Sequence, residues 1–324
     1  MKNKYLIRME EPEDCLIYRD GAGIFYRMFL DPVTILLKNE MDCMQFHTAA
    51  SDPIEYHEHD KGTETFFVSQ GKFQCNCMGR GFVMQAGDIL HIQPWMGHGF
   101  IPIEPESRLN ILFMGIDQQV ITQNWQRMLR DYPGVYENLK AQGKFRATSG
   151  AVATRNLPVA SDFPPEQVHQ LRMAGVGLRD HEFEGVKMQL KVARYETEGV
   201  KEIWDLHMQP GFYCDWDDFL PEYRLFYVKS GKVHCKVKVT STETLEFDAV
   251  GENLITIPPY TPFGFEVTEE ARMYDMDCSA LMQDLCEEFE LLKQEHPEKA
   301  ADKQEFLSLC KTFNFNCTDV GYRG

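Results

Sequence analysis

The sequence contains no apolar run that approaches the roughly 18 residues needed to cross a bilayer. Residues 1–11 mix charged with apolar side chains and lack the apolar core of a signal peptide. Basic side chains are also in deficit, with 33 Lys and Arg against 50 Asp and Glu, for a formal net charge of −17. Such a surface repels nucleic-acid backbones and anionic membranes. We therefore expect a cytoplasmic protein that binds neither nucleic acid nor membranes.

A framework of closely paired cysteines is missing as well. The ten Cys are scattered over 324 residues, and Cys75 and Cys77 are too near each other along one expected strand for an ordinary disulfide. This usage suits a reducing compartment. Cys-x-Cys can bind a metal, but no second pair lies nearby, so we interpret both as core residues of a strand.

Short runs of β-branched and aromatic residues, bounded by turn residues, fill two long stretches of the chain. This pattern predicts an all-β protein built from antiparallel sandwiches or barrels, whose closure removes exposed strand edges. Helical spacing appears after each stretch, and the last helical segment is expected to break at Pro297. We predict four regions, which are an N-terminal barrel at 1–117, a helical linker at 118–185, a C-terminal barrel at 186–278 and a helical tail at 279–324.

Two imidazoles and a carboxylate lie within eight residues of one another in the first barrel. His57 and His59 alternate along an expected strand and therefore face the same side. Glu64 follows after a bend at Lys61-Gly62 and returns along the next strand. Two imidazoles and a carboxylate from neighbouring strands form part of a coordination sphere for a divalent metal.

A fourth ligand is expected from residues 87–98, where a strand and a turn at Pro94 and Gly97 precede His98. This order returns an imidazole to the same pocket. With 10 His in 324 residues, an H-x-H followed by an acidic residue at one set position arises by chance only about 0.05 times. The pattern therefore indicates a metal site, and the remaining alternative is a hydrogen-bonded surface cluster.

These two stretches resemble the two sequence motifs of the cupin superfamily. The first motif reads H-x-H, three or four residues, Glu, six residues and Gly, and the second runs from Gly through Pro and Gly to a His. The positions that match are His57, His59, Glu64, Gly71, Gly87 and His98. Ser51 and Pro102 depart from the Gly and Asn common in the family. The resemblance implies that His57, His59, Glu64 and His98 are metal ligands.

The second half of the chain repeats the spacing of glycines and prolines that bounds the strands of the first half. Residues 224–231 mirror 64–71, and residues 251–264 mirror 87–100. Such self-similarity is typical of a duplicated barrel, so the chain resembles a bicupin, with two jelly-roll barrels in tandem.

The ligands do not recur in the second copy. Arg224 stands where Glu64 does in the first copy, and Pro262 stands where His98 does. We therefore expect a C-terminal barrel without a metal. The most economical role for Arg224 is a buried ion pair with Asp217 or Asp218; the alternative is that it binds a ligand carboxylate.

Three imidazoles and a carboxylate leave about two positions open on an octahedral ion, which is typical of catalytic sites. The spacing does not choose among Fe, Mn, Ni, Zn, Co and Cu. Phe66 and Phe100 are expected on the ligand face, with Trp95 at the lip, where they suit a planar or apolar substrate. Barrel cores are rich in such residues, so core packing is the alternative. His91 is expected either behind the ligands or as an ordinary strand residue.

Bicupins include quercetin and gentisate dioxygenases, oxalate decarboxylases and phosphomannose isomerases, and the ligand set does not select among these reactions. We expect a metal-dependent enzyme with one active site in the N-terminal barrel, a dioxygenase acting on a small aromatic or enolisable substrate. The alternatives are an oxygen-independent isomerase, lyase or decarboxylase, in which the metal is a Lewis acid, and a non-catalytic module that binds a small molecule. Barrel edges and the helical tail favour a homodimer.

Overall fold

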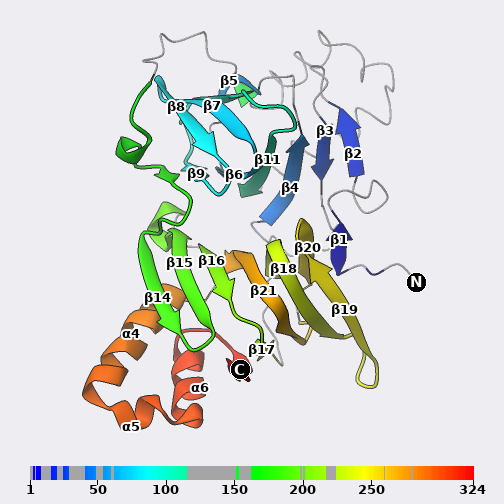
Figure 1. The fold of residues 1–324 in the computed structure, drawn as a ribbon, viewed down its shortest axis with the longest axis vertical. Coiled ribbons are helices and arrows are strands. Elements are labelled where there is room, and N and C mark those ends of the chain that lie inside the picture. Colours follow the sequence, from blue (N-terminus) through cyan, green and yellow to red (C-terminus); the bar gives the residue numbers. More distant parts are fainter. Residues whose placement is uncertain are drawn as a thin grey trace. The chain divides into compact units, whose positions relative to one another are not determined.

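The computed structural model describes Asn3, Gly199 and residues 5–8, 16–19, 25–28, 41–48, 54–59, 62–114, 151–152, 162–197, 201–216, 224–258, 260–278 and 280–324 (Figure 1). The chain forms two compact units. The N-terminal unit is Glu11–Val176, and the C-terminal unit combines Met1–Glu10 with Gly177–Gly324. Each unit is dominated by curled antiparallel sheets, so the predicted all-β class with two jelly-roll barrels is confirmed.

Two antiparallel sheets make the N-terminal unit. The larger has the strand order β13 (Leu171–Arg172), β9 (Ile89–Ile92), β6 (Thr63–Gln70), β11 (Arg108–Met114), β4 (Met41–Thr48), β3 (Phe25–Met28) and β2 (Leu16–Arg19). The smaller has the order β12 (Ala151–Val152), β5 (Ile54–His59), β10 (His98–Pro102), β7 (Lys72–Cys77) and β8 (Arg80–Gln85).

Alternation along β7 shows how this sequence builds the core. Phe73, Cys75 and Cys77 are buried, while the residues between them are partly exposed. Successive side chains of a strand point to opposite faces, so one face of β7 packs inward. Cys75 and Cys77 are free thiols in the apolar core, as the sequence predicted.

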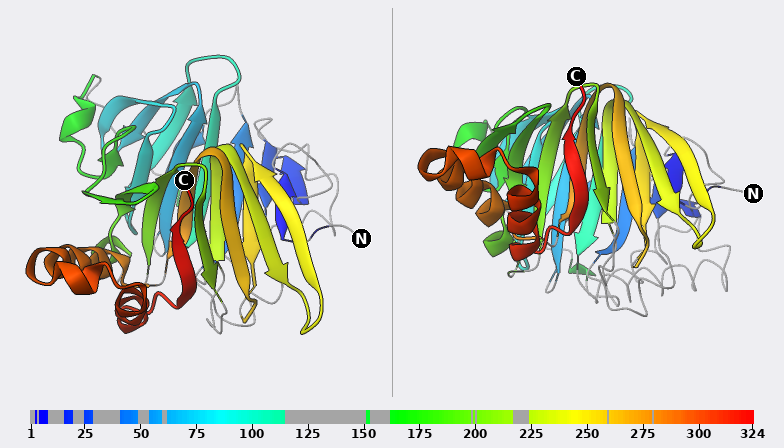
Figure 2. Two further views of the ribbon diagram at one scale, coloured as in Figure 1. Left: turned by 60° about the horizontal axis from the view of Figure 1, so that its bottom comes forward. Right: turned by 90° about the horizontal axis from the view of Figure 1, so that it is seen from below.

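The C-terminal unit is a single ten-stranded antiparallel sheet that curls on itself (Figure 2). Its main path is β1 (Leu6–Arg8), β20 (Asn253–Ile257), β18 (Arg224–Lys238), β21 (Phe263–Cys278), β16 (Glu202–Met208), β15 (Val186–Val192) and β14 (Arg179–Phe183). Three further pairings complete it: β19 (Thr244–Val250) pairs with β18, and β17 (Phe212–Trp216) pairs with both β21 and β22 (Cys317–Tyr322). Register shifts between β18 and β21 at residues 228–233 bend both long strands.

The two copies of the repeat turn at equivalent glycines. Gly71, between β6 and β7, has φ +70°, and Gly231, within β18, has φ +77°. A Cβ atom on Gly71 would collide with Ser107, and one on Gly231 would collide with the backbone carbonyl of Glu270. Only glycine allows both the left-handed backbone and the close approach of neighbouring atoms. This explains why both copies of the repeat have glycine at this position.

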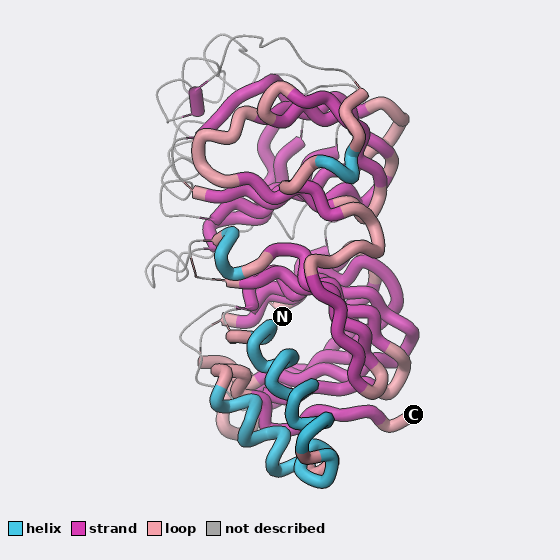
Figure 3. Tube along the Cα trace, turned by 90° about the vertical axis from the view of Figure 1, so that its left-hand side faces the viewer, coloured by secondary structure: helices cyan, strands magenta, loops and turns pink. Residues whose placement is uncertain are grey.

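Three helices precede the last strand, namely α4 (Met282–Glu295), α5 (Pro297–Ala300) and α6 (Lys303–Thr312) (Figure 3). The apolar face of α4 buries Met282, Leu285 and Cys286, and Asp302 caps α6 by accepting hydrogen bonds from two backbone N–H groups of its first turn. The predicted break at Pro297 is present. None of the helices in the described part of the chain has the length and hydrophobicity of a membrane span.

Four features of the elements differ from the sequence prediction or lie beyond it. Strand β1 pairs with β20 and so joins the C-terminal unit. The tail ends in β22, which pairs with β17. Within the linker predicted at 118–185, the helical spacing falls at residues 120–132, which lie outside the described residues. The described part of the expected linker holds the short 3₁₀ helix η3 (Pro165–Gln167) and strands β13 and β14.

Candidate metal centre

Three strands of the N-terminal unit bring His57, Glu64 and His98 together. His57 on β5 pairs directly with His98 on β10, and Glu64 comes from β6 in the other sheet. One ligand atom from each residue lies within 4.8 Å of the other two. The imidazole rings are 4.3 Å apart between centroids, and His98 Nε2 is 2.9 Å from Glu64 Oε2. Among the residues that the structure describes, this is the one such group of metal-ligating side chains.

The backbone orients the imidazole of His98. Its Nδ1 lies 2.9 Å from the carbonyl oxygen of Met96. A carbonyl only accepts hydrogen bonds, so Nδ1 carries a proton and donates it. In the neutral ring, Nε2 then presents a lone pair toward the Glu64 carboxylate. Two lone-pair donors aimed at the same point, both almost completely buried, form a site that a cation stabilises.

These distances fit one divalent transition metal. With bonds of about 2.1 Å, neighbouring ligand atoms on an ion are about 3 Å apart and opposite ones about 4.2 Å. The 2.9 Å between Glu64 and His98 is close to the first value, and the whole group lies within 4.8 Å. Imidazole nitrogen and carboxylate oxygen are ligands for first-row divalent metals. The alternative of a surface cluster is weakened, since Glu64 and His98 are 2% and 0% exposed.

His59, the fourth expected ligand, ends β5 and pairs with Ala151 of β12 through the backbone. Its side chain lies outside the described part of the structure. Its role as a ligand therefore stays a prediction from the H-x-H motif.

Phe66 and Phe100 pack behind the imidazole of His98. The Phe66 ring centroid is 5.2 Å from His98 and 4.5 Å from Phe100. Both phenylalanines are fully buried and belong to the core of the unit. Trp95 differs, since it is 59% exposed and adopts φ +65° in the turn before His98.

His91 lies on the other face of β6 from Glu64. It pairs with Thr65 across β6 and β9, and its Nδ1 is 2.9 Å from Thr65 Oγ1. Thr65 alternates with Glu64 and Phe66 along β6, so it points away from them. The structure therefore does not bring His91 to the metal-ligating group.

Sequence reasoning did not place Cys77 or Tyr56 near the site. Cys77 pairs with His98 across β7 and β10. Burial raises the pKa of Cys77 to about 12, although Arg80 opposes the shift, so the side chain is a neutral thiol. The Tyr56 ring occupies the space that a side chain at position 97 would need, which explains the Gly97 beside His98. No local pattern reveals either contact, because both depend on strand register.

The equivalent region of the C-terminal unit holds an ion pair. Arg224 Nη2 is 2.9 Å from Asp275 Oδ2, and both side chains are buried. The expectation of a buried acidic partner is therefore confirmed, but the partner found is Asp275. The residues proposed from the sequence, Asp217 and Asp218, lie outside the described residues. The acidic partner was missed because it comes from β21, 51 residues further along the chain.

Comparison with known proteins supports the same fold. A family model described as Cupin domain matches residues 44–114, which include all four expected ligands. The formate complex of Lactobacillus farciminis oxalate decarboxylase superposes with a TM-score of 0.53 and 12% identity over 92% of this chain and 94% of that chain. A variant of Bacillus subtilis oxalate decarboxylase superposes with a TM-score of 0.54 and 13% sequence identity, covering 100% of this chain and 90% of that chain. Another structure of the same enzyme, from work on its Mn(II) centres, has a TM-score of 0.53 and 13% sequence identity, with the same coverage of both chains.

At 12–14% identity these structures establish the fold alone. No curated protein sequence matches the chain.

Proposed function

Because this chain carries a cupin domain and has the fold of the two-domain cupins, we propose that it is a metal-dependent enzyme with one active site in its N-terminal unit. His57, Glu64 and His98 hold the metal, and His59 is the fourth ligand. The observation that carries the proposal is the buried convergence of two imidazoles and a carboxylate from three strands. A divalent transition metal is the cofactor that such donors suit.

The reaction we propose is the loss of CO2 from a small carboxylic acid. Support comes from the structural similarity to oxalate decarboxylases. The dioxygenase expected from the sequence has weaker support, because it rested on aromatic residues at the site. Phe66 and Phe100 pack on each other and on the ring of His98 in the core of the unit, so core packing accounts for both side chains.

The residues of the site have separate tasks. When bound, a divalent metal supplies a Lewis acid that orients a carboxylate and stabilises the charge left when CO2 departs. Glu64 contributes one negative charge and the imidazoles none, so the loaded site keeps a net positive charge and attracts a small anion. The Met96 carbonyl holds His98 in the tautomer whose Nε2 points inward. Phe66 and Phe100 exclude water behind that ring, which strengthens electrostatic interactions.

The test measures CO2 and oxygen together. The purified chain, loaded with Mn(II), is supplied with oxalate and then with a panel of small di- and 2-oxo-carboxylic acids. Each turnover replaces CO2 by a proton on the product, so CO2 release and proton uptake rise in step. We expect CO2 release without equivalent oxygen consumption. The His98→Ala variant should release CO2 at least 100-fold more slowly. The control variant His234→Ala, at a partly exposed histidine of the other unit, should release it at the wild-type rate.

Each other outcome has a definite meaning. Consumption of one O2 per product molecule would instead support the dioxygenase reaction expected from the sequence. A chain that binds metal yet leaves the whole panel unreacted, with and without oxygen, would favour the non-catalytic module. Equal activity of His98→Ala and wild type would place any reaction elsewhere in the molecule.

A further inference from the structure

The C-terminal unit contains a cavity of about 520 Å³, which we call the C-terminal cavity. Its lining residues come from strands β14 to β18, β21 and β22 of the curled sheet and from helices α4, α5 and α6. Its volume lies within the range of about 300–1,000 Å³ that is usual for small-molecule sites.

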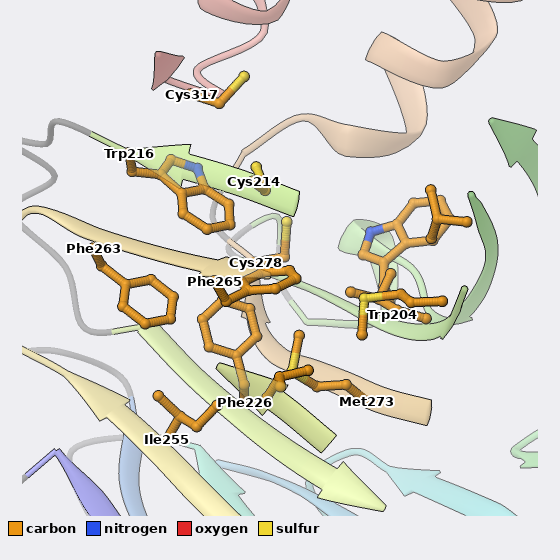
Figure 4. Packing of buried hydrophobic residues seen from close by; sticks show 14 of the residues in the cluster. Trp204, Cys214, Trp216, Phe226, Ile255, Phe263, Phe265, Met273, Cys278 and Cys317 are labelled. Atoms are coloured by element: carbon orange, nitrogen blue, oxygen red, sulfur yellow. The ribbon is translucent and has the colours of Figure 1, made fainter. Parts of the chain in front are cut away.

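Aromatic side chains line one part of the C-terminal cavity. Three of them, Trp216, Phe226 and Phe265, are drawn in Figure 4 among the buried hydrophobic residues of the unit. The ring centroids of Trp216 and Phe265 are 5.8 Å apart, and those of Phe226 and Phe265 are 6.2 Å apart. Phe315 meets Trp216 edge-on at 5.7 Å. Rings at these separations favour another ring in stacked or edge-on contact. The wall therefore suits a planar aromatic ligand.

A single ion pair interrupts this wall. Arg224 is 7% exposed, and its guanidinium carbon lies 4.9 Å from the Trp216 ring centroid and 5.2 Å from that of Phe226. Asp275 accepts a hydrogen bond from Arg224, and both residues line the cavity. Burying such a pair costs desolvation that its attraction does not always offset, so the pair is weak as a purely stabilising device. A guanidinium has five N–H donors in a planar fork and can serve more than one acceptor.

The charges that line the C-terminal cavity balance. Its cations are Arg224, Lys293 and Lys303, and its acids are Glu182, Glu184 and Asp275. The lysines are held at exposed ion pairs, Lys293 with Glu290 and Lys303 with Asp319. Of these three ion pairs around the cavity, the Arg224–Asp275 pair is the buried one. Arg224 is therefore the donor positioned to meet a ligand that enters the aromatic part of the cavity.

We propose that the C-terminal cavity binds a planar aromatic molecule that carries an oxygen acceptor. The ring packs against Trp216, Phe226 and Phe265, and the oxygen accepts hydrogen bonds from Arg224. Arg224 occupies the position in the repeat that Glu64 has in the first barrel. At this position the first barrel has a metal-ligating carboxylate, and the second barrel has a guanidinium that can bind an organic ligand. All lining residues belong to the C-terminal unit, so the site is independent of the metal centre and of its reaction.

Titration calorimetry of the full chain tests the proposal with three probes. These are 2-naphthoate, which has a ring and an anionic acceptor, 2-naphthol, which has a ring and a neutral acceptor, and octanoate, which has an acid without a ring. We expect one saturable site per chain for at least one naphthyl probe, and at least 10-fold weaker binding of octanoate. The stronger naphthyl probe identifies the charge of the natural ligand. Absence of saturable binding of both naphthyl probes at millimolar concentration would overturn the proposal.

Two variants locate the binding. Arg224→Gln combined with Asp275→Asn keeps a neutral hydrogen-bonding pair, and we expect it to weaken 2-naphthoate at least 10-fold. Ala300→Trp, at the half-buried rim, fills space without touching the anchor and should reduce binding of both naphthyl probes. Tyr195→Ala, at a 73% exposed residue away from the cavity lining, is the matched control and should bind like wild type.

His57→Ala separates this site from the metal centre. We expect it to lose metal and to bind 2-naphthoate as wild type does. If neither cavity variant changes binding of the naphthyl probes, the site lies elsewhere and the proposal fails. The rim variant alone is sufficient for this decision should the double variant not fold.

Discussion

At the scale of single residues, the two units treat buried charge differently. In the N-terminal unit a carboxylate and two imidazoles point to one place, and a bound cation would stabilise this arrangement. The C-terminal unit pairs Arg224 with Asp275. The sequence motifs predicted that His57, Glu64 and His98 lie together, and the structure places one ligand atom from each within 4.8 Å of the others. Asp275 could not be found this way, since its pairing depends on the register of distant strands.

Removing one member of the Arg224–Asp275 pair should destabilise the C-terminal unit strongly. Arg224→Met leaves a buried carboxylate without its cation, which costs about 3–5 kcal/mol. The double variant Arg224→Met with Asp275→Leu should recover most of this loss, because no buried charge remains. Urea unfolding measures both. Equal stability of the single and double variants would contradict a buried ion pair.

The Asp205 carboxylate predicts an acid-dependent loss of stability. Burial alone would raise its pKa, but hydrogen bonds from Arg272 and His207 and the charges of Arg272 and Lys191 lower it to about 2. The usual pKa is 3.8, so the stabilisation is complete above that value and is lost as the pH falls toward 2. The shift corresponds to about 2 kcal/mol.

Unfolding free energies of wild type and Asp205→Asn between pH 6 and pH 2 check this prediction. The difference between them should shrink as the pH falls below about 4. The exposed Asp284→Asn is the control. A difference that stays constant down to pH 2 would exclude the Asp205 network as its source.

At the scale of elements, glycine positions fix where the long strands bend. Gly231→Ala meets both a positive φ and the Glu270 carbonyl, whereas Gly175→Ala has a similar φ of +74° with open space around it. The left-handed backbone alone costs about 1–2 kcal/mol for a residue with a Cβ. We expect Gly175→Ala to lose about that much stability and Gly231→Ala clearly more, as measured by thermal unfolding. Equal losses would show that the close approach does not matter.

Strand existence was predictable, but strand pairing was not. Alternation and turn residues located most strands of both barrels, and helical spacing located α4 and α6. Strand β22 was missed because Cys317–Tyr322 contains Asp319 and Gly321 and lacks alternation, so it gains its order from pairing with β17. The nearness of Cys77 to His98 was likewise hidden in the pairing of β7 with β10.

At the scale of the whole molecule, the proposed metal belongs to the N-terminal unit alone. Removing metal with a chelator should therefore loosen the N-terminal unit and leave the C-terminal unit unchanged, because a bound ligand stabilises only the state that binds it. Hydrogen exchange read by mass spectrometry reports each unit separately. We expect faster exchange in peptides from β5, β6 and β10 on chelation. Equal acceleration in β16 and β21 would contradict the assignment.

The most direct measurement is the metal content of the purified chain beside that of Glu64→Gln, which keeps the shape of the side chain and removes its charge. Elemental analysis should find one transition-metal ion per wild-type chain and little or none in the variant. Glu104→Gln, an exposed partner of Lys72, is the control and should retain the ion. A Glu64→Gln chain that holds as much metal as wild type, or a wild-type chain with two ions, would contradict a single metal centre in the N-terminal unit.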